Sequence, residues 1–182
     1  VLENSHDIPY IKPPLDPHGI ALMKRIAREA RKRFGGPMGL QLLEAANESA
    51  LEIACEADLD FLRVEGYVFA HIGGAGLIEG CAGRLLRKRA SLGCKHVKIF
   101  ADVNKKHCSH ALTGDLDITD LVKQDEFSLV DAVIATTAAI TSVTVSPAKS
   151  DRPVSISHSR TPKAHTSDRR STARPRACSG DM

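Results

Sequence analysis

An acidic residue followed by a basic cluster is the strongest chemical signal in this 182-residue sequence. The apolar run at residues 97–103 contains Asp102 near its end and is followed by Lys105 and His107. If the run forms a buried parallel strand, the polar residues at its carboxyl end face a crevice or a barrel mouth. There Asp102 would act as a general base or help hold a divalent metal, and Lys105 would stabilise a developing anion or position a phosphate.

Polar residues at the ends of other apolar runs would join the same site. Glu3 would be a partner acid, and Asn4 and Gln41 would bind hydroxyl groups. Arg63, followed by Glu65, would pair with a carboxylate or phosphate through two parallel hydrogen bonds. The predicted catalytic residues are Asp102, Lys105 and Glu3, and the predicted substrate-binding residues are Asn4, Gln41, Arg63 and His107. This set suits chemistry on a sugar phosphate or a nucleoside-like ligand.

Each of these assignments has a structural alternative. Arg63 and Asp102 would also be explained as an interior ion pair that only orders the fold. Lys105 and Lys106 would then belong to a solvated loop, and Glu3 would sit at a frayed end.

A resident metal or nucleotide cofactor finds little support in the sequence. His107, Cys108 and His110 resemble metal ligands in type, but no second cluster supplies the three or four ligands that zinc requires. Residues 73–76 read Gly-Gly-Ala-Gly, which lacks the order of a dinucleotide fingerprint and predicts a flexible loop over the mouth. We expect no metal site, and the sequence does not indicate a cofactor.

The elements that would position these residues alternate between strands and helices. Apolar runs predict strands near residues 39–43, 61–64, 97–103 and 131–135. Helices are predicted between them: one begins at Asp16-Pro17 and ends near Phe34, one is capped by Asn47, one covers residues 77–92, and one is capped by Asp117. Repeated units of this kind predict an α/β fold with a parallel sheet, either open or closed into a barrel.

Several short motifs in residues 1–135 resemble those of the BtpA family. They are Leu2-Glu3-Asn4, Gly39-Leu40-Gln41-Leu42-Leu43, Phe61-Leu62-Arg63-Val64, Gly76-Leu77-Ile78-Glu79-Gly80, Lys98-Ile99-Phe100-Ala101-Asp102-Val103 and Lys105-Lys106-His107. The resemblance implies a partial (β/α)8 TIM barrel of the ribulose-phosphate-binding type, with about five βα units. On that template the first unit is absent, and so are the seventh and eighth, which commonly hold a substrate phosphate. Residues 134–138 also lack the glycine of the family's T-G motif.

The resemblance leaves three functions open. The first is a protein that binds or acts on a small sugar-phosphate or nucleoside-like ligand at the barrel mouth. The second is a non-enzymatic assembly factor, since cyanobacterial members have a role in photosystem I biogenesis. The third is an inactive truncated product, whose unpaired sheet edges would favour self-association.

The composition divides the chain near residue 140. Residues 1–140 form the predicted barrel domain, with a net charge of −2, whereas residues 141–182 are rich in Ser, Thr, Pro and Arg and carry +5. Such a tail cannot bury enough apolar surface to order itself, so we expect disorder. It would be either a basic interaction tail or the product of a shifted reading frame or retained intron. Because it lacks aromatic residues, we expect no specific nucleic-acid binding.

The remaining composition bears on the protein's environment. No apolar run approaches the ~20 residues of a membrane span. Five cysteines without a CxxC motif argue against a disulfide framework and favour a reducing, intracellular compartment. Cys55 and Cys81 are accordingly predicted to be buried free thiols.

Overall fold

The computed structural model describes residues 1–137 and 140–145. Its elements in chain order are β1 (Leu2–Glu3), α1 (Pro17–Arg33), β2 (Gly39–Gln41), α2 (Asn47–Glu56), β3 (Phe61–Val64), β4 (His71–Gly73), β5 (Gly76–Ile78), α3 (Ala82–Ser91), β6 (Lys98–Val103), the 3-10 helix η1 (Ala111–Thr113), α4 (Ile118–Phe127), β7 (Ala132–Thr137) and β8 (Ile140–Val145). This order confirms the predicted alternation of strands and helices over most of the chain.

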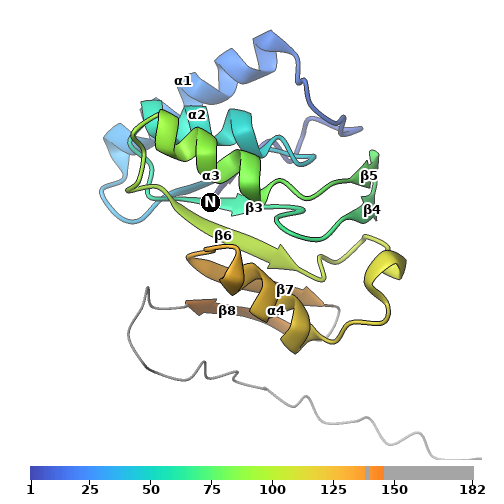
Figure 1. Ribbon diagram of the computed structural model, residues 1–182. Helices are drawn as coiled ribbons and strands as arrows, with labels where there is room; N and C mark the ends of the chain where they lie inside the picture. The colour runs from blue at the N-terminus through green and yellow to red at the C-terminus, as the bar shows by residue number, and fades with distance from the viewer. Residues whose placement is uncertain (138–139, 146–182) are drawn as a thin grey trace, which may run out of the picture.

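One sheet contains the strands in the order β1-β2-β3-β6-β7-β8. The first five are parallel, and β8 is antiparallel to β7. The described strands form an open sheet with β1 and β8 at its edges, so the parallel α/β architecture is confirmed and the barrel is not. Strands β4 and β5 form a separate antiparallel hairpin, which Figure 1 places near the carboxyl ends of β3 and β6.

Alternation along the central strands gives the sheet two different faces. Leu62, Val64, Ile99 and Ala101 are fully buried in the main apolar core, which α1, α2 and α3 cover (Figure 1). The intervening residues of β3 and β6 point to the other face. Phe61 and Phe100 stack there with ring centroids 4.6 Å apart. Gly39 lies under this pair, because a Cβ atom at that position would come within 2.2 Å of the Phe61 ring.

Local capping chemistry explains where two helices begin. The Asp16 carboxylate accepts a hydrogen bond from the Gly19 N–H at 3.2 Å, and the Asp117 carboxylate accepts one from the Asp120 N–H at 2.9 Å. Both caps are as predicted. The prediction that Asn47 caps α2 is wrong, because Asn47 is itself the first residue of this helix. Its side chain instead donates to the Glu65 carbonyl oxygen at 2.7 Å.

The segment before α3 also differs from the prediction. Residues 77–78 were expected to begin a helix, but they belong to β5, and residues 73–76 form the turn of the hairpin instead of a free loop. The helix begins only at Ala82 because the chain first passes close to another backbone segment. A Cβ atom on Gly80 would lie 2.2 Å from the Val68 carbonyl oxygen, so this passage requires glycine.

The predicted tail boundary at residue 141 falls inside strand β8. Residues 141–145 pair with β7, so for these five residues the structure differs from the expected disorder. The rest of the predicted tail, residues 146–182, lies outside the described residues.

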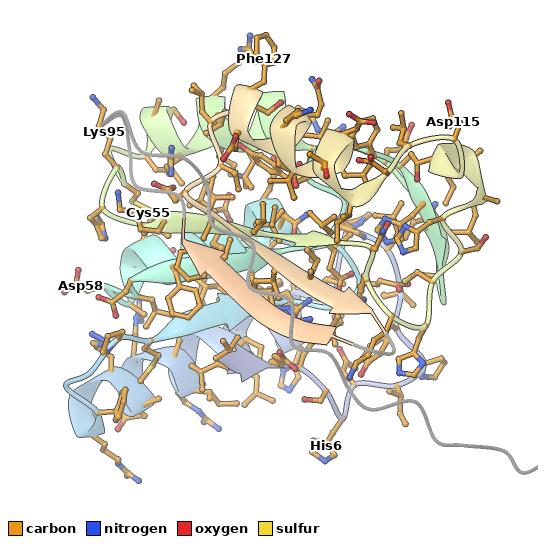
Figure 2. All side chains as sticks on the ribbon, turned by 90° about the horizontal axis from the view of Figure 1, so that it is seen from below. His6, Cys55, Asp58, Lys95, Asp115 and Phe127 are labelled. Atoms are coloured by element: carbon orange, nitrogen blue, oxygen red, sulfur yellow. A yellow bond between two sulfur atoms is a disulfide. The ribbon has the colours of Figure 1, made fainter. Side chains whose placement is uncertain are left out.

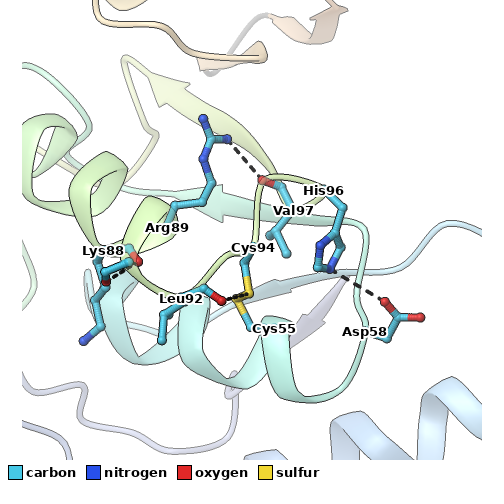
Figure 3. Close-up of a disulfide and its surroundings, with 9 residues drawn as sticks. Cys55, Asp58, Lys88, Arg89, Leu92, Cys94, His96 and Val97 are labelled. Carbon is cyan, nitrogen blue, oxygen red and sulfur yellow. Dashed lines mark hydrogen bonds and ion pairs between the residues drawn. A yellow bond between two sulfur atoms is a disulfide. The ribbon is translucent and has the colours of Figure 1, made fainter.

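The prediction that Cys55 is a free thiol is wrong. Cys55 on α2 and Cys94 before β6 form a disulfide, with Cα atoms 5.8 Å apart (Figure 3). Their separation of 39 residues leaves no signal in the sequence, because only the packing of α2 beside the turn after α3 brings them together. Cys81 is a buried free thiol, as predicted. The reducing, intracellular compartment stays a prediction.

Candidate functional site

A cavity of about 410 Å³ opens at the carboxyl ends of the parallel strands. Its wall includes five of the seven predicted site residues, namely Glu3, Gln41, Arg63, Lys105 and His107. They come from four separate segments of the chain, so the predicted convergence of strand ends holds for these five. Tyr10, Glu44 and Gly74 also line this cavity.

Arg63 lies between two carboxylates. Its Nε is 3.1 Å from both carboxylate oxygens of Asp102, and its Nη1 is 3.4 Å from Glu3 Oε1. The contact with Asp102 joins neighbouring strands β3 and β6 on the face that the helices leave open. The predicted convergence of Glu3, Arg63 and Asp102 is therefore present, and so is the interior ion pair that was its structural alternative.

Asp102 lies behind Arg63 and does not line the larger cavity. Its side chain is only 1% exposed, and this burial raises the pKa of the carboxyl group, although Arg63 opposes the rise. Asp102 instead contributes to a smaller cavity of about 30 Å³, together with His71 and Asp125. Its role as a general base stays a prediction.

Glu65 holds two of the cavity residues through one oxygen atom. Its Oε1 accepts hydrogen bonds from Lys105 Nζ at 2.5 Å and from Gln41 Nε2 at 2.7 Å. Its other oxygen, Oε2, is buried and has no hydrogen-bond partner among the described residues. Burial raises the pKa of Glu65, and the charge of Lys105 opposes this rise. The Lys105 side chain is 16% exposed, so it does not belong to a solvated loop.

Glu44 is a site residue that the sequence reasoning missed. It is buried, and its carboxylate accepts hydrogen bonds from the backbone N–H groups of Gly74 at 3.1 Å and Ala75 at 2.6 Å. Lys105 Nζ lies 4.0 Å from Glu44 Oε1. An acidic residue directly after the apolar run at 39–43 was the available signal, since it matches the position of other predicted site residues.

Asn4 and His107 occupy less central positions. The Asn4 side chain donates to the Leu43 carbonyl oxygen at 2.9 Å and accepts from the Leu43 N–H at 2.6 Å. Both polar ends of Asn4 are thus used to tie β1 to the segment after β2, and the residue does not line the cavity. His107 lies on the wall and is exposed to solvent.

The BtpA family model matches residues 1–150. This chain belongs to the BtpA family. The match includes the segments that carry Glu3, Gln41, Arg63, Asp102 and Lys105, and it confirms the resemblance found in the sequence motifs. No solved structure matches the chain.

Three relatives each match about three quarters of this chain. An uncharacterised mitochondrial protein of Caenorhabditis elegans is 40% identical over 144 residues, which are 76% of this chain and 52% of that protein. The photosystem I biogenesis protein BtpA of Synechocystis is 33% identical over 136 residues, or 74% of this chain and 46% of the relative. An uncharacterised Archaeoglobus fulgidus protein is 33% identical over 75% of this chain and 53% of its own length. The chain therefore spans about half the length of these relatives.

The polar side chains that line this BtpA-family site include two carboxylates, the Gln41 amide and three cationic side chains, which are Arg63, Lys105 and Lys106. Within residues 1–137 and 140–145, no group of three or more His, Cys, Asp or Glu side chains is arranged to hold a metal ion. In the same part of the chain, no helix has the length and apolar character needed to cross a membrane.

The side chains that line the site make it suited to a polar ligand. Such a ligand would accept hydrogen bonds from Arg63 and Lys105 and donate them to carboxylates.

Proposed function

We propose that this chain supplies part of a binding site for a small polyhydroxylated ligand, either a sugar phosphate, whose anionic group the cations of the site would attract, or a nucleoside-like molecule. The observation that carries the proposal is the placement of Glu3, Gln41, Arg63 and Lys105 around one cavity. Carboxylate and amide groups accept hydrogen bonds from ligand hydroxyls, and the two cations attract an anion. The cavity's volume of about 410 Å³ lies within the usual range for small-molecule sites.

The arrangement of charges supports a specific role for each side chain. Glu65 fixes Lys105 and Gln41, so both reach the cavity in defined positions. Asp102 holds the Arg63 guanidinium through Nε, so its terminal nitrogen atoms are directed away from that contact. Asp102 is 1% exposed and does not line this cavity, so its part in the proposed site is to position Arg63.

We propose this ligand site for the whole protein as well as for the chain described here. The name of the Synechocystis relative would support the alternative of an assembly role, but no described surface of this chain favours that role over a ligand site. We therefore propose that the protein binds its ligand in the cavity, and the identity of the ligand will define the reaction.

Calorimetric titration tests this proposal with ribose 5-phosphate and adenosine as probes. We expect saturable binding of at least one of them by the full chain, and we expect Arg63→Met to weaken it by about 10-fold or more, since a charge-assisted contact is lost. Arg84→Met is the matched control, because Arg84 is an exposed helical arginine whose partner is Glu48. The proposal fails if neither probe binds at millimolar concentration, or if the two variants behave alike.

A further inference from the structure

We propose that the backbone N–H groups of Gly74 and Ala75, together with Lys105, form a cradle for the ligand's phosphate group, and that Glu44 occupies this cradle until the phosphate displaces it. The statement that the bound anion is the ligand's phosphate group rests on the proposed function. The existence of an oxyanion cradle rests on geometry alone.

The cradle already holds an oxyanion in a two-point arrangement. Glu44 Oε1 accepts from the Gly74 N–H at 3.1 Å, and Oε2 accepts from the Ala75 N–H at 2.6 Å. Lys105 Nζ stands 4.0 Å from Oε1. Two successive amide N–H groups and an ammonium group are donors that bind phosphate oxygens as well as carboxylate oxygens. The Glu44 carboxylate is thus an internal stand-in for an external anion.

The hairpin turn is built for close approach of such a group. A Cβ atom on Gly73 would lie 2.4 Å from Glu44 Oε1, and one on Gly74 would lie 3.8 Å from Oε2. A side chain at residue 73 would therefore push the oxyanion off the backbone. The glycine at this position allows the anion to reach the amide groups directly.

Exchange of Glu44 for a phosphate replaces one anion with another, so the shared donors Gly74 N–H, Ala75 N–H and Lys105, and not the net charge, support the exchange. Lys105 faces two carboxylates, Glu65 at 2.5 Å and Glu44 at 4.0 Å, so this cluster carries more acid than base. Repulsion from Glu44 is among the causes that raise the pKa of Glu65. A phosphate, with its three acceptor oxygens, would take over both amide hydrogen bonds and the contact with Lys105 once Glu44 is released.

The cradle opens into the proposed ligand site. Glu44, Gly74 and Lys105 line the same 410 Å³ cavity as Arg63 and Gln41. A phosphate held at the hairpin would therefore leave the sugar portion of the ligand beside the groups proposed to bind its hydroxyls. This placement differs from the loops after the seventh and eighth barrel strands, which commonly hold phosphate in such barrels.

The test uses inorganic phosphate and the full chain labelled with ¹⁵N. We expect phosphate to shift the amide resonances of Gly74 and Ala75, and we expect Glu44→Gln to bind phosphate about 10-fold more tightly, because the variant lacks the competing charge. Glu48→Gln is the matched control: it removes the same charge from an exposed residue of α2 and should leave phosphate affinity unchanged.

Failure of the cradle and failure of the proposed function give different results. Unchanged phosphate affinity in Glu44→Gln, or resonance shifts that spare Gly74 and Ala75, would overturn the cradle. If Glu44→Gln does not fold, phosphate titration of the unaltered chain still decides, since absent shifts at both amides at high phosphate concentration contradict the proposal. Tight phosphate binding by Glu44→Gln without binding of ribose 5-phosphate or adenosine would support the cradle and sink the proposed function.

Discussion

The carboxylates at the two ends of the parallel sheet differ in how they are paired with donors and cations. At the amino ends of the strands, the Asp131 carboxylate accepts from the Ile99 N–H at 2.9 Å and from Arg89 at 3.0 Å, and it pairs with Lys98 at 3.2 Å. Asp60 similarly accepts from the Met38 N–H at 2.7 Å. Asp131 and Asp60 each join a backbone donor to a cation, which is Arg31 in the case of Asp60.

The carboxyl ends hold an excess of acid. Glu3, Glu44, Glu65 and Asp102 gather around Arg63 and Lys105. Glu65 keeps one buried oxygen without a partner among the described residues. In Figure 2, Cys55, Asp58 and Lys95 lie at one end of the molecule and Asp115 lies at the other. Asp131 and Asp60 therefore serve the fold, whereas the acid-rich carboxyl end is where we propose that the ligand binds.

Removal of Asp131 should give the largest loss of stability. Asp131→Ala leaves Arg89 and the Ile99 N–H without their shared acceptor, so we expect the free energy of unfolding to fall by about 3 kcal/mol. Urea denaturation measures this change. Asp58→Ala is the control at the same end, because its side chain is 88% exposed and should contribute less than about 1 kcal/mol. Equal effects of the two variants would remove the distinction between the ends.

The second prediction concerns Asp125, a buried carboxyl group that lacks a charged partner among the described residues. Burial alone raises its pKa to about 7. The protonated group supplies stability that is fully present below the ordinary pKa near 3.8 and is lost as the pH rises through about 7. We therefore expect Asp125→Asn to match the original chain near about pH 4 and to exceed its stability by roughly 2 kcal/mol near about pH 8. A pH-independent difference between the two in thermal melts would contradict this explanation.

Glu65→Gln should have the smallest effect on stability. The amide can still accept from Gln41 Nε2, and it removes a charge whose burial is unfavourable, so we expect the unfolding free energy to change by less than about 1 kcal/mol. Loss of the ion pair frees Lys105, and ligand affinity should fall by about 10-fold. A large loss of stability with unchanged affinity would show that the carboxyl end is built for the fold as well.

Local sequence chemistry predicted the parts of the fold that depend on near neighbours. The apolar runs at residues 61–64 and 97–103 marked β3 and β6 closely, and Asp16 and Asp117 marked two helix starts. The hairpin was missed because its strands, His71–Gly73 and Gly76–Ile78, are too short to show an alternating pattern. Sheet closure also did not follow from the pattern, since an open sheet and a barrel share it.

The candidate site was predictable only where strand ends alone position the residues. Arg63 and Asp102 belong to paired strands, so their contact follows from the register of β3 and β6. Glu44 meets the hairpin turn 30 residues further along the chain, and this contact depends on a segment whose conformation was not predicted. The disulfide has the same origin, since packing of helices brings Cys55 to Cys94.

The absence of a side chain at Gly39 decides where the Phe61 ring can lie on the open face of the sheet. The Phe61 ring rests on this residue and stacks on Phe100, and the aromatic pair lies two residues before Arg63 and Asp102. Any larger residue at position 39 would lift the ring toward the polar layer. A residue outside the cavity wall therefore makes room for the aromatic layer that lies next to Arg63 and Asp102 on the two strands.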